Sequence, residues 1–234
     1  NIAIAKKITQ QEAKNDARTA GVVYVSELAK DLLEQISFCA RDSEYVDEKS
    51  GVSARMSITA FENLLSTAER RSLMNGDEKT SIRFSDFTGI IPSITGKVEL
   101  VYEGEQEGAD EVAKILIDDA VMSQFKMIFP RIPKLEKEGL KTPYTDLVNW
   151  FDDNFIELNF TDTDNEFYTN LKTVTPLVAV IEEYAAKLST EDQDFSMELV
   201  LWALTIKCNL YKSENDTAFK FNSAGINQYF QRNN

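Results

Sequence analysis

The stretch SELAKDLLEQISFCA, residues 26–40, has the spacing of an amphipathic helix. Its apolar residues recur every three or four positions, which places them on one helical face. The members of that face are Leu28, Leu32, Ile36 and Cys39. Ser26 stands just before them and can cap the helix with its hydroxyl oxygen. The stretch therefore predicts a helix that buries one side in a core.

A second amphipathic helix is predicted in SGVSARMSITAFENLLSTAERRSL, residues 50–73. Ser53 or Ser57 is its candidate N-cap, and Asn75-Gly76 marks its end. Its apolar stripe consists of Met56, Ala60, Phe61, Leu64, Leu65 and Ala68. Two long helices of this kind favour a helical bundle.

The rest of the chain is also mostly helical in its spacing. Helices are expected over residues 109–129, about 167–188 and about 191–212, and the fold class is therefore all-α or nearly so. A loop-like region around Pro130, Pro133 and Gly139 suggests a boundary. We expect a helical domain over residues 1–139 and a helical C-terminal extension over residues 140–234.

Composition excludes several classes of function. The chain has 234 residues and a formal charge of −14, which disfavours nucleic-acid binding. It contains no histidine, so serine–histidine and cysteine–histidine catalysis and histidine-bound zinc are excluded. The two cysteines, Cys39 and Cys208, indicate buried thiols in a reducing, cytoplasmic compartment. No apolar run is long enough to span a membrane.

The start of the second helix carries a candidate anion site. Arg55 stands in the first helical turn, where free backbone N–H groups and a guanidinium can hold a phosphate together. Arg41 and Lys49 are nearby in the sequence and are further candidates for phosphate or subunit contacts. The alternative is a surface arginine paired with Asp42 or Glu44.

Two other charged groups have less specific interpretations. Arg70 and Arg71 could contact a phosphate or a neighbouring subunit, or could be solvated charges near a helix C-terminus. Glu103, Glu105 and Glu107 lie around Gly104 and Gly108, which suggests an exposed acidic loop that contacts other proteins. We expect no tight metal site there, because the spacing is not that of a calcium-binding loop.

Two of these segments resemble a known family. SGVSAR at residues 50–55 and ITGKVELVYEGEQEG at residues 94–108 are similar to the helical lid region of AAA+ ATPases of the MoxR and magnesium-chelatase type. The resemblance is best over about residues 26–130. It implies that Arg55 is the sensor 2 arginine, which contacts nucleotide phosphates.

The same resemblance implies that ATP is bound by another part of a longer parent protein. The chain has no G-x-x-x-x-G-K-[ST] loop, so the core that binds ATP and Mg²⁺ would precede Asn1 in a longer parent protein. The parent would be a homo-oligomeric ring that remodels a protein client, and this chain alone would be inactive and hold no cofactor tightly.

Two alternatives remain open. The chain could be a stand-alone acidic helical module that binds a basic protein and has no role with nucleotides. A hydrolase that uses paired carboxylates is less favoured, because no such pair shares an evident pocket-forming loop.

Overall fold

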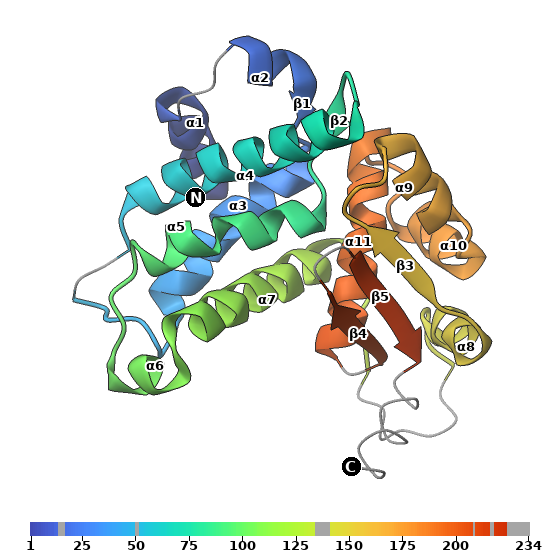
Figure 1. Ribbon diagram of the computed structural model, residues 1–234. Helices are drawn as coiled ribbons and strands as arrows, with labels where there is room; N and C mark the ends of the chain where they lie inside the picture. The colour runs from blue at the N-terminus through green and yellow to red at the C-terminus, as the bar shows by residue number, and fades with distance from the viewer. Residues whose placement is uncertain (14–16, 50–51, 134–140, 208, 216–217, 224–234) are drawn as a thin grey trace. The chain divides into compact units, whose positions relative to one another are not determined.

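The computed structural model describes residues 1–13, 17–49, 52–133, 141–207, 209–215 and 218–223. The expectation of a mostly helical chain is confirmed (Figure 1). The chain divides into two compact units, Asn1–Gln124 and Phe125–Asn234, and the division falls inside one helix, α7 (Ala109–Ile128). The boundary expected after residue 139 lies outside the described residues.

The first unit is built on two long helices, α3 (Glu27–Asp42) and α4 (Ala54–Asn75). A third helix, α1 (Ile2–Glu12), packs against both of them (Figure 1). The smaller elements of the unit are α2 (Ala17–Val22), β1 (Val23–Tyr24), β2 (Thr80–Ser81), the 3₁₀ helix η1 (Phe84–Ile90), α5 (Ile91–Thr95) and α6 (Tyr102–Glu107). Strands β1 and β2 pair in parallel.

Local signals explain where α3 and α4 begin and end. The Ser26 hydroxyl accepts a hydrogen bond from the Ala29 N–H at 3.2 Å, and Ser53 caps α4 in the same way through the Arg55 N–H. Each such cap stabilises a helix by about 1 kcal/mol. Gly76 ends α4 with a φ of 76°, a left-handed conformation that glycine adopts without strain. Both helices therefore begin where the sequence predicts.

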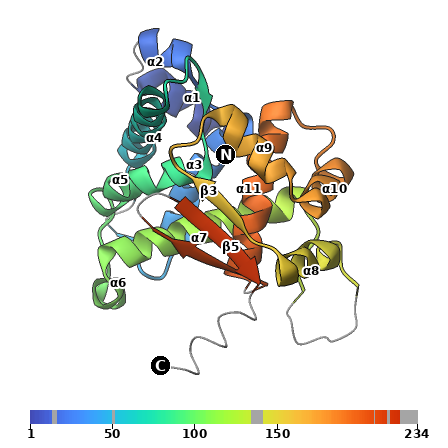
Figure 2. The same ribbon diagram turned by 45° about the vertical axis from the view of Figure 1, so that its right-hand side comes forward.

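The second unit contains helices and a small sheet. Its helices are α8 (Thr145–Asp153), α9 (Asp164–Lys172), α10 (Thr175–Tyr184) and α11 (Thr190–Ile206). Its strands are β3 (Ile156–Asn159), β4 (Leu210–Glu214) and β5 (Ala218–Ser223), which form an antiparallel sheet in the order β3-β5-β4. Helices α8, α9 and α11 contact the strands (Figure 2).

The sheet adds three strands that the expectation of a helical C-terminal extension did not include. The helix expected to reach residue 212 ends at Ile206, and a strand begins at Leu210. Phe219 and Phe221 alternate with Lys220 and are buried on one face of β5, where Trp202 of α11 meets Phe219 edge to face at 5.3 Å. The strand thus gains its stability from a helix and from β3, both distant in the sequence.

Candidate functional site

Arg55 lies in the first turn of α4 with an exposed side chain, as expected for an anion contact. The next residue, Met56, is only 1% exposed, so the helix is anchored in the core directly beside the arginine. Among the described residues, no ion pair or side-chain hydrogen bond engages the Arg55 guanidinium. The alternative pairing with Asp42 or Glu44 is therefore not observed.

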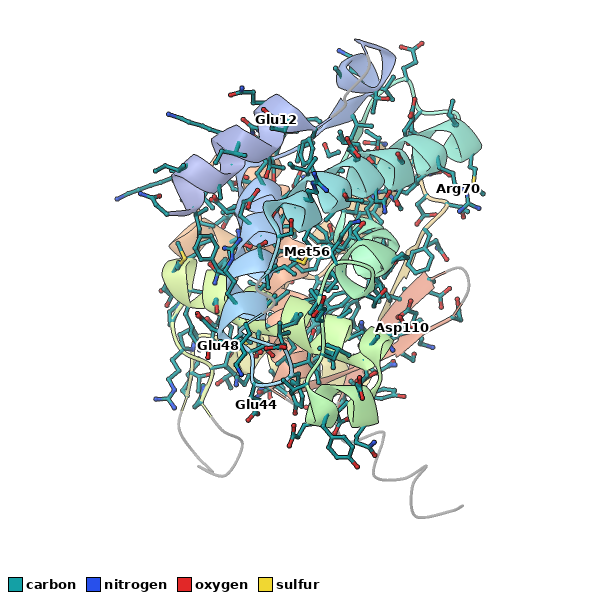
Figure 3. The ribbon with its side chains drawn as sticks, turned by 90° about the vertical axis from the view of Figure 1, so that its left-hand side faces the viewer. Glu12, Glu44, Glu48, Met56, Arg70 and Asp110 are labelled. Atoms are coloured by element: carbon teal, nitrogen blue, oxygen red, sulfur yellow. The ribbon has the colours of Figure 1, made fainter. Side chains whose placement is uncertain are left out.

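Arg41 and Lys49 lie at the same end of the bundle, in and after the last turn of α3. Both side chains are exposed, and the Arg41 guanidinium carbon lies 5.1 Å from the centre of the Phe38 ring. The connection from α3 to α4 also carries Glu44 and Glu48 (Figure 3). Three cations, Arg41, Lys49 and Arg55, thus border one connection.

Arg70 is remote from this end of the helix. It is fifteen residues after Arg55, about 22 Å along the axis of α4. Figure 3 shows it near the end of α4 opposite Met56, and its side chain is exposed. Arg70 therefore cannot share one small anion with Arg55, and it remains a candidate only for a contact with another protein.

The expectation for Arg71 is wrong. Its side chain is 6% exposed and donates hydrogen bonds inside the protein. Nε and Nη2 bind the two carboxylate oxygens of Asp86 at 3.2 and 2.9 Å, and the remaining donors reach Thr80 Oγ1 and the Ser81 carbonyl, both at 2.7 Å. This arginine joins α4 to β2 and η1, so it is neither solvated nor available to a phosphate.

The acidic segment is a short helix, α6, and not a loop. The side chains of Glu103, Glu105 and Glu107 are exposed, which confirms that part of the prediction. Gly104 faces inward, and a Cβ there would lie 2.5 Å from the Tyr45 carbonyl oxygen. The glycine therefore permits a close approach of α6 to the chain that follows α3, and the apparent loop signal is a packing signal.

A cavity of about 230 Å³ lies between α1, α3 and α4. Glu34 is among the residues that line it, although this residue is only 2% exposed. Thr9 donates to Glu34 Oε1 at 2.5 Å, and Ser57 donates to Oε2 at 3.0 Å. The remaining lining residues are Asn1, Ile4, Ala5, Ile8, Phe38 and Arg41.

Sequence reasoning missed Glu34. Its neighbours Leu32, Leu33 and Ile36 are buried, so an acidic residue stands on the inward side of α3. The only available signal was the width of the apolar face of α3. The buried face of this helix is wider than the stripe predicted from the sequence.

The remaining groups that could carry chemistry provide no further candidate site among the described residues. Burial raises the pKa of the Cys39 thiol, which makes it a poor nucleophile at neutral pH, and Cys208 lies outside the described residues. Within the described ranges, no group of three Asp, Glu or Cys residues is arranged to hold a metal ion. In the same ranges, no helix combines the length and the apolar character needed to cross a bilayer.

Comparisons with known proteins identify no relative. No protein-family model, no curated protein and no solved structure matches the chain.

Proposed function

We propose that this chain is the lid and C-terminal part of an AAA+ ATPase of the MoxR and magnesium-chelatase type. The observation that carries the proposal is Arg55, an exposed arginine at the N-terminus of a helix whose next residue is already buried. It lies within the SGVSAR segment on which the resemblance rests. Lys49 and Arg41 add positive charge to the same connection.

The position of Arg55 suits a sensor of phosphate. A guanidinium can bind two phosphate oxygens at once, and the N-terminal end of α4 adds a favourable dipole. Because α4 packs against α3 and η1, a force on Arg55 would move the helix and its neighbours together. The arginine would favour the closed lid when nucleotide is present, which is a conformational role.

Other parts of the parent follow from the same proposal. ATP and Mg²⁺ would be held by an ATPase core that precedes Asn1, in a cytoplasmic homo-oligomeric ring that remodels a protein client. Glu103, Glu105 and Glu107 on α6 are exposed charges that suit contacts with a neighbouring subunit or the client.

The test compares Arg55→Ala with Arg70→Ala in the polypeptide that includes the segment before Asn1. The Arg55 variant should lose about ten- to a hundredfold in ATP turnover, since a charge-assisted bidentate contact contributes about 1.5–3 kcal/mol. Arg55→Lys should restore little, because lysine lacks the planar fork. Arg70→Ala is the matched control on the same helix; Arg71→Ala cannot serve, because Arg71 is part of the core.

Two results would overturn the proposal. One is a coding sequence with an initiator Met directly before Asn1, or an upstream segment without G-x-x-x-x-G-K-[ST]. The other is equal turnover by the Arg55→Ala variant, the Arg70→Ala variant and the parent. Either result would favour the second candidate, a stand-alone module that binds a basic protein, which the charge of −14 and the exposed acids of α6 support.

A further inference from the structure

We propose that the cavity between α1, α3 and α4 binds a small zwitterion, with its ammonium group at Glu34 and its carboxylate at Arg41. The proposal does not depend on Arg55 or on the proposed ATPase. It rests on the charges that line the cavity, on their spacing along α3 and on the volume of the cavity.

Glu34 is the residue that would bind the ammonium group of the ligand. Its carboxylate is held by two neutral hydroxyls, from Thr9 and Ser57, and no cation among the described residues pairs with it. An ionised carboxylate removed from water requires a counter-charge, which hydroxyls do not supply. Each oxygen also keeps a further lone pair that can accept an N–H from a ligand.

The nearest lysines are engaged elsewhere. Lys6 and Lys30 line a separate small cavity that also reaches Glu34. Lys6 Nζ lies 2.7 Å from Asp31 Oδ1 and 3.0 Å from Glu27 Oε2, and Lys30 Nζ lies 2.7 Å from Glu27 Oε1. Both ammonium groups are therefore paired with acids other than Glu34.

Arg41 is the residue that would bind the carboxylate at the other end of the ligand. Arg41 follows Glu34 by seven residues, nearly two helical turns, so both face the cavity from the same side of α3 about 10 Å apart along its axis. Phe38 lies between them, and the Arg41 guanidinium reaches back over its ring. This reach shortens the separation between the two charges.

The walls and the volume define the body of the ligand. Ile4, Ala5, Ile8 and Phe38 are apolar, so a short hydrocarbon chain fits between the charged ends. A volume of about 230 Å³ leaves room for a small ligand of several heavy atoms. An ω-amino acid has this form.

The experiment is calorimetric titration of the full chain with 6-aminohexanoate, hexylamine and hexanoate. We expect one saturable site for 6-aminohexanoate and at least tenfold weaker binding of the two probes that lack one charge. Glu34→Gln, which keeps the shape and removes the charge, should weaken 6-aminohexanoate at least tenfold. Arg41→Gln should abolish the preference for 6-aminohexanoate over hexylamine.

Two further variants keep the test decisive. Ala5→Leu fills the cavity without changing its polar groups and should also remove binding, whereas the matched surface control Arg70→Gln should leave it unchanged. Melting curves establish that each variant is folded. Absence of saturable binding by the folded wild-type chain, or wild-type affinity in either Glu34→Gln or Ala5→Leu, would overturn the proposal.

One added probe distinguishes two kinds of ligand that carry the same ammonium and carboxylate groups, a free ω-amino acid and the C-terminus of a polypeptide. Nα-acetyl-L-lysine carries an ε-ammonium group and a free α-carboxylate, as the C-terminal lysine of a polypeptide does. Tighter binding of this probe than of 6-aminohexanoate would assign the site to a polypeptide C-terminus, and the reverse order would assign it to a free ω-amino acid.

Discussion

Two carboxylates in the first unit are equally buried and have opposite surroundings. Asp86 and Glu34 are each 2% exposed. Asp86 binds the Arg71 guanidinium through both oxygens and also accepts a hydrogen bond from the Arg83 N–H at 2.9 Å. Glu34 accepts hydrogen bonds from two hydroxyl groups and has no cation beside it among the described residues.

The difference separates a structural acid from a binding acid. Asp86 is neutralised by Arg71 in an ion pair that joins η1 to α4, and Arg71 also binds Thr80 and Ser81 of β2. Glu34 is held in position but not neutralised, and it faces a cavity. A buried ion pair is costly to break, whereas a buried charge without a partner is costly to keep.

The largest effect is expected for Arg71→Ala. The substitution leaves Asp86 buried without its counter-charge and should lower the free energy of unfolding by about 3–5 kcal/mol. Urea unfolding followed by circular dichroism measures it, with Arg70→Ala as the control that should change stability by no more than about 0.5 kcal/mol. A loss in Arg71→Ala as small as in the control would show that the pair does not hold this part of the unit together.

A smaller loss is expected for Ser57→Ala. Its removal takes one of two donors from the Glu34 carboxylate and should cost about 1–3 kcal/mol in the same unfolding assay. In a Glu34→Gln background the cost should fall, because the charge that needs the donor is absent. Equal costs in both backgrounds would mean that Ser57 serves packing or its contact with Ser37 at 3.0 Å instead.

Glu34→Gln itself tests the comparison most directly. The amide keeps an acceptor for one hydroxyl and can donate to the other, and the buried charge is lost. We expect a change in the free energy of unfolding of less than about 1 kcal/mol, in the stabilising direction, when no ligand is added. A destabilisation similar to that of Arg71→Ala would place Glu34 with Asp86 as a structural acid.

The smallest effect belongs to an exposed acid, Glu27. A hydrogen bond from Lys30, and a second one from Lys6, lower the pKa of Glu27 below its ordinary value of 4.5. The contribution of Glu27 is therefore present above pH 4.5 and disappears as the pH falls through the folded-state pKa. Since the side chain is 59% exposed, Glu27→Gln should cost only about 0.5 kcal/mol at pH 7.

This last expectation is checked by unfolding both proteins at pH 7 and pH 3, at low and high salt. The difference between wild type and Glu27→Gln should shrink at pH 3 and at high salt, because the interaction is ionic and exposed. A difference that is constant across pH and salt would assign the role of Glu27 to the first turn of α3 and not to its lysine partners.

The sequence by itself determined the helical character and the helix starts. Ser26, Ser53 and Gly76 act through backbone groups within a few residues, and apolar spacing depends only on helix period, so both signals can be read locally. The exposure of Arg55 and of the acids on α6 also follows from these patterns.

Only the tertiary structure decided which charges are internal and where the sheet forms. Arg71 is buried because Asp86 and Thr80 come from elements beyond the end of its helix. Glu34 is buried because α1 and α4 close over α3, and β5 exists because it pairs with β3, some sixty residues earlier in the chain. Burial and strand pairing join residues that are distant in sequence, and no periodicity within a single segment records which distant partner it meets.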